Sequence, residues 1–244
     1  MTFKIIIPCY NAAQWIRRCV QSVISQTVSD WEVVVVNDGS TDETAAELQT
    51  LSDSRISVIS NQHNQASSLG SIIRGIDAIA GRTAPDDVII NVDGDDCLEN
   101  VDVLACLQDV YTDHDIWLTY GNYCNNVWVG SVCHYLAETR TYRSGGINQW
   151  CTSHLRTFRK HLFDRVNRVD FLDYDGKPYQ FAGDLALMYP LVELAGPRRI
   201  KFIDKCLYVY NVNAGGEGGR SAYQSRITPI LARIYSRPPY TEVP

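Results

Sequence analysis

Three carboxylates, those of Asp93, Asp95 and Asp96, follow a short β-branched run at residues 88–90. Carboxylate oxygens are ligands that hard divalent cations prefer, and Gly94 lets the backbone turn tightly between the first two. An ion held there would keep coordination positions for the phosphate oxygens of a nucleotide diphosphate. A solvated acidic turn is the alternative, because the D-x-D pattern is short and common. The secondary-structure elements around the cluster are needed to distinguish a metal site from a solvated turn.

Residues 1–97 alternate between predicted strands and helices. Strands are predicted at 3–7, 31–36, 56–59 and 88–92, and helices at 12–25, after 42 and at 67–80. Ser40 and Glu43 have the spacing of a capping box for the second helix. Buried strands joined by helices are typical of a parallel sheet covered on both faces, whose ligands bind where strands end. Residues 8–11, Asp38 and Asp93 should therefore converge on one edge.

The pattern is looser after residue 97. A helix is predicted at 101–111, a strand at 116–120, an antiparallel excursion at 126–135, a loop at 139–151, a strand at 154–160, a helix at 161–166 and a polar, turn-rich segment at 170–180. A helix at 184–195 contains Pro190, which predicts a kink or break. Strands at 200–203 and 206–210, a glycine-rich loop and a helix at 223–235 complete an α/β fold with a Rossmann-like, mostly parallel sheet flanked by helices.

Composition excludes several classes of protein. The chain of 244 residues has a net charge of -6 and lacks a long Lys/Arg run, which argues against nucleic-acid binding. The chain also lacks an apolar stretch of membrane-spanning length and the apolar core of a signal peptide. We therefore expect a cytoplasmic protein with no integral membrane segment. The eight cysteines form no C-x-x-C pair, which disfavours zinc and favours core cysteines in a reducing compartment.

Side chains elsewhere could complete a site. Asp38 could accept a hydrogen bond from the N3–H of uracil, or form an Asx turn. Asp184, at the start of a predicted helix, could be a general base or an N-cap. His154 and Arg156 could reach a diphosphate or a metal, although a histidine before a strand is as often structural.

Three motifs in sequence order, Ile5-Ile6-Ile7-Pro8-Cys9-Tyr10-Asn11, Val36-Asn37-Asp38-Gly39-Ser40-Thr41-Asp42 and Asp93-Gly94-Asp95-Asp96, resemble those of the family-two glycosyltransferases of GT-A fold. The resemblance continues at 155–159, 183–188 and 207–211. It implies a nucleotide-sugar donor, usually UDP-linked, a divalent cation, Mn²⁺ or Mg²⁺, and inverting transfer to a hydroxyl of a glycan or glycoconjugate acceptor.

The resemblance also implies roles for particular residues. Asp38 would contact the base, Asp93 the ribose and Asp95 the metal, and Asp184 would be the catalytic base. The expected donor-binding residues are Pro8, Tyr10, Asn11, Asp38, Asn64, Asp93, Gly94 and Arg156, and His154 is a second candidate metal ligand. The chain departs from the family pattern in having Gln65-Ala66 after Asn64, where many relatives have a glycine, and Gly183 where a glutamate is usual.

We expect a single domain with a nucleotide-binding half at 1–97, an acceptor-binding half at 98–210, and a mobile loop and C-terminal helix at 211–244. The loop at 211–220 could close over the donor. Two other functions remain open. A non-catalytic nucleotide-sugar-binding module would need the acidic cluster but not Asp184, and a nucleotidyltransferase would need a glycine- and arginine-rich loop after the first strand.

Overall fold

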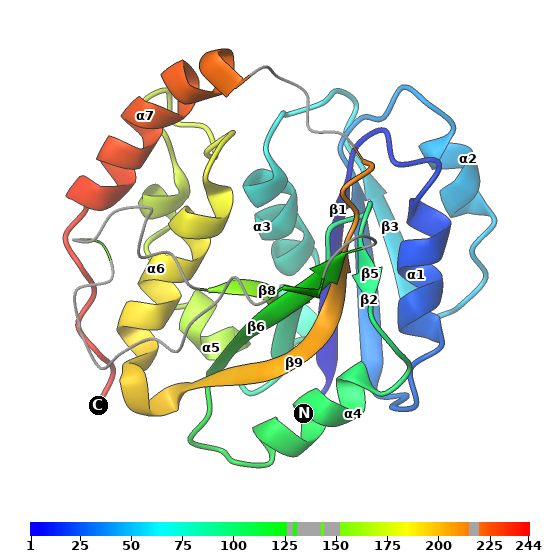
Figure 1. Ribbon diagram of the computed structural model, residues 1–244, viewed down its shortest axis with the longest axis horizontal. Coiled ribbons are helices and arrows are strands. Elements are labelled where there is room, and N and C mark those ends of the chain that lie inside the picture. Colours follow the sequence, from blue (N-terminus) through cyan, green and yellow to red (C-terminus); the bar gives the residue numbers. More distant parts are fainter. Residues whose placement is uncertain (126–128, 131–142, 144–151, 215–219) are drawn as a thin grey trace.

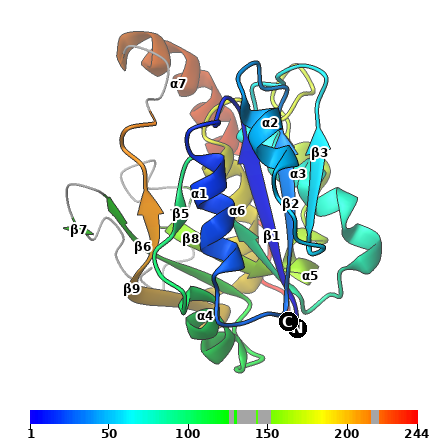
Figure 2. The ribbon, with the colours of Figure 1, turned by 90° about the vertical axis from the view of Figure 1, so that its right-hand side faces the viewer.

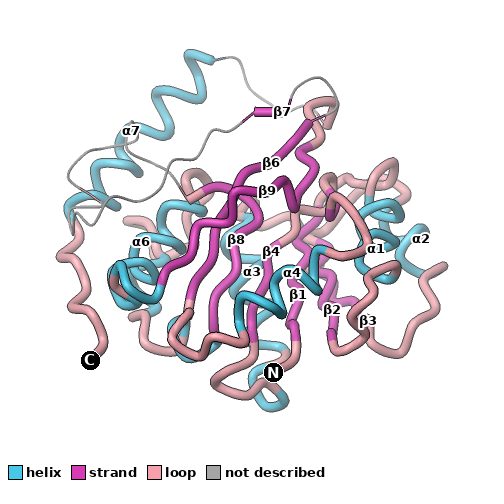
Figure 3. The backbone as a smooth tube through the Cα atoms, turned by 60° about the horizontal axis from the view of Figure 1, so that its bottom comes forward, coloured by secondary structure: helices cyan, strands magenta, loops and turns pink. Residues whose placement is uncertain are grey.

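The computed structural model describes residues 1–125, 129–130, 143, 152–214 and 220–244. Within them, the strands form one sheet in the order β3-β2-β1-β4-β8-β6-β9-β5, and β7 pairs with β6 (Figure 1). The strands run side by side through the middle of the molecule (Figure 3). This is the expected α/β fold, in which a mostly parallel sheet is flanked by helices.

The first half contains the parallel part of the sheet. Its strands are β1 (Phe3–Cys9), β2 (Trp31–Asn37), β3 (Ile56–Ser60) and β4 (Val88–Asn91), and its helices are α1 (Ile16–Ile24), α2 (Thr44–Gln49), α3 (Ser68–Ala78) and the 3₁₀ turn η1 (Ala80–Arg82). Every residue of β1 is buried. Alternate residues of β1 enter two separate cores: Ile6 packs with α3, and Ile5 and Ile7 pack with α1. Both faces of the sheet are therefore covered, as the apolar runs predict.

The second half adds antiparallel pairs. It contains β5 (Cys97–Leu98), α4 (Val103–Tyr111), β6 (Leu118–Asn125), β7 (Val129–Gly130), β8 (Ser153–Arg159), α5 (Lys160–Phe163), η3 (Arg168–Phe171), α6 (Gly183–Ala195), η4 (Pro197–Arg199), β9 (Ile200–Tyr210) and α7 (Arg220–Ser236). β8 runs antiparallel to both β4 and β6, whereas β6 and β9 are parallel. Figure 2 shows β6 and β9 on one side of the parallel strands β1, β2 and β3.

Several local predictions are wrong. The strands expected at 200–203 and 206–210 are one strand, β9. α2 has no side-chain cap, so Ser40 and Glu43 form no capping box. α6 continues through Pro190 without a break, because every residue from Leu185 to Ala195 is buried and packing outweighs the lost hydrogen bond. The antiparallel excursion at 126–135 is described only at β7, and the loop at 139–151 lies outside the described residues except at Arg143.

The cysteines also differ from expectation. Cys124 and Cys206 form a disulfide between β6 and β9, although the sequence favoured reduced thiols. Among the described residues the free cysteines are Cys9, Cys19 and Cys97, which are buried as expected of small core residues, and the half-buried Cys106. In the part of the chain that the structure describes, we found no helix with the length and apolar character needed to cross a membrane.

Candidate functional site

A pocket of ≈ 400 Å³ opens where the parallel strands end. The loops after β1, β2, β3 and β4 all contribute to its wall. All the donor-site candidates that precede residue 97 lie on it: Pro8, Tyr10, Asn11, Asp38, Asn64, Asp93, Gly94 and Asp95. The predicted convergence of strand ends is therefore observed. We call this pocket the first pocket.

Asn11 joins the first two loops of the first pocket. Its backbone N–H donates to Ser40 Oγ at 2.9 Å, and its own Oδ1 accepts from the backbone N–H of Thr41 at 2.8 Å. Ser40 therefore links two strand ends and does not cap a helix. Sequence spacing could not reveal this, because the two bonded residues lie on different loops.

Asp38 is buried, with 5% exposure, and holds the third loop. Both of its carboxylate oxygens accept from the backbone N–H of Gln65 at 3.1 Å, and Oδ1 also accepts from Asn61 Nδ2 at 2.5 Å. These bonds cross from the β2 end to the β3–α3 loop, so Asp38 does more than form a local turn. Oδ2 accepts only one of these bonds, so its second lone pair is left for a ligand.

The acidic loop, which contains Asp93, Asp95 and Asp96, packs closely against the end of β1. A Cβ at Gly94 would lie 2.6 Å from Cys9 Cβ, and the Gly94 N–H donates to the Pro8 carbonyl at 3.0 Å. Only glycine fits this approach, because a methyl group would need space that Cys9 occupies. Gly94 thereby places the flanking carboxylates of Asp93 and Asp95 on the wall of the pocket.

The three carboxylates divide into two sets. Asp96 faces the protein, where it accepts from Tyr208 Oη at 2.6 Å and from the Asn211 N–H at 2.7 Å. Burial raises the pKa of Asp96 to about 7 despite these bonds. The sequence showed no reason to separate Asp96 from its neighbours, because its partners come from the end of β9 and beyond.

Asp93 and Asp95 face the first pocket. Burial raises the pKa of Asp93 to about 6; the Arg156 guanidinium opposes this shift and the Asp95 charge adds to it. Burial also raises the pKa of Asp95. Two crowded carboxylates whose ionised forms are disfavoured would be stabilised by a cation, and their all-oxygen donor set suits a hard divalent ion.

The protein atoms alone do not enclose such an ion. Among the described residues, no group of three or more histidine, cysteine, aspartate or glutamate side chains is placed to hold a metal. The remaining ligands would have to come from diphosphate oxygens and water. The donor set therefore fits an ion that binds together with a nucleotide diphosphate.

A second pocket, of ≈ 300 Å³, adjoins the first, and Ser68 and Asp93 line both. It contains the remaining predicted site residues, His154, Arg156 and Asp184. Arg156 Nη2 lies 3.4 Å from Asp184 Oδ2. The structure therefore places Arg156 between Asp184 and the acidic loop, and not on the wall of the first pocket.

Asp184 is the second residue of α6, and the N-cap position belongs to Ala182. Its side chain is 34% exposed, and Oδ1 accepts from the Leu185 N–H at 3.0 Å. A Cβ at Gly183 would lie 2.8 Å from Leu69 Cβ of α3, so α3 and α6 pack too closely here for a larger residue.

His154 is buried, with 8% exposure, and stacks on Tyr208 with ring centroids 4.3 Å apart. Its Nε2 lies 3.4 Å from Arg156 Nη2. Burial and the Arg156 charge hold the pKa of His154 well below its usual range, so the imidazole is neutral. It lines the second pocket, whereas Asp95 lines the first.

Residues with a strained backbone lie at the two pockets. Among the described residues, left-handed φ angles outside glycine occur at Asn11, Ala66 and Ala182, with φ values of 50°, 55° and 53°. The first two line the first pocket, and Ala182 lines the second. Such strain is common where a loop is held for binding. Ala66 adopts its left-handed conformation two residues after Asn64.

The sequence did not identify the start of α3 as part of the site. Ser67 caps this helix by accepting from the Gly70 N–H at 2.9 Å, and Ser67, Ser68 and Ser71 line the first pocket. A helix N-terminus favours anions, although the sequence marked these serines only as a helix start. Of the predicted mobile loop, Ala214 lines the first pocket, and residues 215–219 lie outside the described residues.

Comparison with known proteins identifies the class. Residues 4–166 match glycosyl transferase family 2. Chondroitin synthase from Pasteurella multocida strain Pm70 is 36% identical over 119 residues, which are 48% of this chain and 12% of that protein. Residues 1–349 of S. aureus TarS, solved with UDP-GlcNAc, superpose with a TM-score of 0.64 at 19% identity, covering 91% of this chain and 61% of that TarS fragment.

The mannosyltransferase PcManGT from Pyrobaculum calidifontis, solved with GDP-Man and Mn²⁺, superposes with a TM-score of 0.61 at 17% identity, covering 95% of this chain and 62% of that one. The chain spans less than two thirds of each of these proteins. Because the family match covers more than half of the chain, the chain belongs to glycosyl transferase family 2. It is a glycosyltransferase by family, and its fold is the GT-A fold of TarS and PcManGT.

Proposed function

We propose that this domain transfers a sugar from a UDP-linked donor, with inversion, to a hydroxyl of a glycan or glycoconjugate, and that transfer depends on Mn²⁺ or Mg²⁺. One observation carries the proposal: the pocket with Asp38, Asp93 and Asp95 adjoins the pocket with Asp184, through Ser68 and Asp93. Donor-binding and proton-accepting groups thus meet at a shared wall. Transfer between two bound substrates needs this arrangement.

The first pocket would bind the nucleotide. Asp38 would accept from the base, Asp93 from a ribose hydroxyl, and Asp95 would hold the divalent ion. TarS and PcManGT were solved with UDP-GlcNAc and with GDP-Man plus Mn²⁺, which supports a nucleotide sugar and a metal for this fold. When bound, the ion supplies charge neutralisation for the departing diphosphate.

The second pocket would bind the acceptor, with Asp184 as general base. Inversion by a single displacement needs one group that takes the acceptor hydroxyl's proton as the sugar leaves its phosphate. Glu193, the other acidic residue of α6, is unsuitable because Arg143 pairs with both of its oxygens at 2.7 and 2.8 Å. The accessible carboxylate of Asp184 beside a donor pocket favours an enzyme over a binding module.

Two substitutions test the proposal together. Asp184→Asn should keep UDP binding in the presence of Mn²⁺ but reduce UDP release from UDP-sugars by about a hundredfold or more, because the amide cannot accept a proton. Asp95→Ala should abolish the metal-dependent part of UDP binding. Calorimetry with and without Mn²⁺ measures binding, and a coupled assay over a panel of UDP-sugars measures release.

Asp109→Asn, on the exposed side of α4, is the matched control and should change neither quantity. Equal UDP affinity with and without metal, in both the wild type and Asp95→Ala, would refute the metal assignment. A near-wild-type rate in Asp184→Asn would place the base elsewhere.

A further inference from the structure

A third pocket, of ≈ 370 Å³, adjoins the second. One wall is the segment 173–181 and the other is α7, which contributes Arg226, Pro229 and Ile230. Gln180 and Phe181 line both the second and the third pocket. The second pocket, which contains Asp184, and the third pocket, at α7, are therefore adjacent at these two residues.

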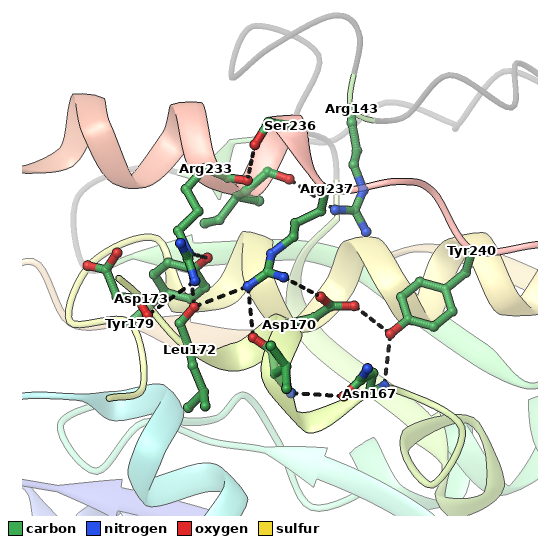
Figure 4. Close-up of polar contacts among 12 residues, drawn as sticks. Arg143, Asn167, Asp170, Leu172, Asp173, Tyr179, Arg233, Ser236, Arg237 and Tyr240 are labelled. Atoms are coloured by element: carbon green, nitrogen blue, oxygen red, sulfur yellow. Dashed lines mark hydrogen bonds and ion pairs between the residues drawn. The ribbon is translucent and has the colours of Figure 1, made fainter. Parts of the chain in front are cut away.

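Two arginines, Arg233 in α7 and Arg237 directly after it, hold the two walls together (Figure 4). Arg233 donates to the carbonyls of Leu172 and Asp173 and to Tyr179 Oη, each at 3.2 Å. Arg237 forms an ion pair with Asp170 at 3.2 Å. These bonds hold the irregular segment against the helix through contacts within the protein itself.

The lining combines aromatic rings with side chains that form hydrogen bonds. Tyr174 is 73% exposed, with the Arg233 guanidinium 4.0 Å from its ring centroid. The Arg226 guanidinium lies 4.7 Å from the Phe181 centroid, and Arg226 Nη2 donates to Gln180 Oε1 at 3.2 Å. Sugars present C–H faces that pack on aromatic rings and hydroxyls that bond polar side chains, so this lining suits a sugar unit.

We propose that the third pocket is a distal acceptor subsite, which binds a sugar unit of the acceptor beyond the one whose hydroxyl reaches Asp184. The acceptor is then a glycan of at least two sugar units, and monosaccharides are poor substitutes. This inference rests on the proposed function, because it takes the second pocket as the acceptor site. The shared residues Gln180 and Phe181 set the direction in which the glycan extends.

The test compares acceptors of different length. The probes are defined oligosaccharides of one to six units containing glucose, N-acetylhexosamine or glucuronate, assayed for binding to the full chain with UDP and Mn²⁺. We expect at least one series to bind tenfold or more tightly than its monosaccharide. Tyr174→Ala and Lys177→Ala should each reduce this gain by about fivefold or more, and leave UDP affinity and monosaccharide binding within twofold.

Val169→Ala is the matched control, because Val169 is 51% exposed on the neighbouring η3 and lies outside the third pocket. Thermal melting checks that each variant is folded. Absence of a length-dependent gain in every series, or a gain that survives both substitutions, overturns the subsite. UDP affinity separates this outcome from failure of the proposed function: lost donor binding rejects the enzyme, whereas retained donor binding without a length effect rejects the third pocket alone.

Discussion

In several of their loops, the two halves of the molecule hold the irregular backbone with different kinds of side chain. In residues 1–97, short acidic side chains accept from loop N–H groups. Asp38 binds the N–H of Gln65, Asp42 those of Ala13 and Thr44, and Asp87 those of Thr2 and Ala84. These bonds tie strand-end loops to one another, and the first pocket lies among the loops that Asp38 and Asp42 hold.

In the second half, arginines donate to carbonyls. Arg159 is 1% exposed and reaches the carbonyls of Ile116, Asp86, Tyr111 and Asp113. Arg233 and Arg237 do the same for η3 and the residues after it. A long guanidinium with five donors can serve several carbonyls at once. At these loops the second half therefore depends on a few long side chains, whereas the first half depends on several short ones.

The largest expected effects come from replacing one of these side chains in each half. Arg159→Met should lower the free energy of unfolding by ~3–5 kcal/mol, because it leaves several buried carbonyls unpaired. Asp87→Ala, which removes two hydrogen bonds from a buried carboxylate, should cost ~1–2 kcal/mol. Urea denaturation monitored by circular dichroism measures both. Equal losses in the two variants would contradict the proposed difference between the halves.

The junction between the halves should show a pH effect. The pKa of Asp96 is about 7 in the folded protein, chiefly through burial, and far above its ordinary value of 3.8, so the folded state holds a proton that the unfolded state has released. In metal-free protein, this group's stabilising contribution is fully present below pH 4 and declines as pH rises to about 7. Asp93, with a pKa of about 6, adds in the same direction.

Asp96→Asn isolates that contribution. The free energy of unfolding of the variant, measured against wild type in EDTA, should improve steadily from pH 4 to 7.5, because the amide does not ionise. Denaturation curves at several pH values give the difference. A difference that is constant across this range would show that Asp96 has no raised pKa.

The smallest expected effect compares the strained loops of the two pockets. Ala66→Gly and Ala182→Gly should each stabilise the protein by ~0.5–1 kcal/mol, because glycine adopts a left-handed φ freely and this outweighs its greater freedom in the unfolded chain. Thermal melts of both variants, with Ala45→Gly in α2 as a helical control that should destabilise, measure the effect. Loss of stability at Ala66 or Ala182 would mean that these positions are not strained.

Local patterns were enough for the parallel strands of the first half. The strands of the parallel sheet lie within two residues of their predicted bounds, because each is a run rich in β-branched residues with proline or asparagine at or next to its end. The donor candidates Pro8, Asp38 and Asp93 line the first pocket because parallel strands end at a common edge. Their individual roles remain predictions.

Other features required the folded chain. The sequence could not reveal β5, the joined strand β9 or the Cys124–Cys206 disulfide, because each depends on segments that meet only after the second half folds back. Ser40 was assigned to a helix cap, although its partner lies on another loop.

By itself, the sequence determined the alternation of strands and helices, the acidic loop after β4 and the aspartate at the start of α6. Only the tertiary structure decided that Arg156 lies beside Asp184, that Asp96 turns inward to Tyr208, and that α7 completes a third pocket. The physical reason is the sequence separation of the residues in contact. Strand ends and turns follow from neighbouring residues, whereas these contacts join side chains that the chain separates by tens of residues and that only packing brings within hydrogen-bond distance.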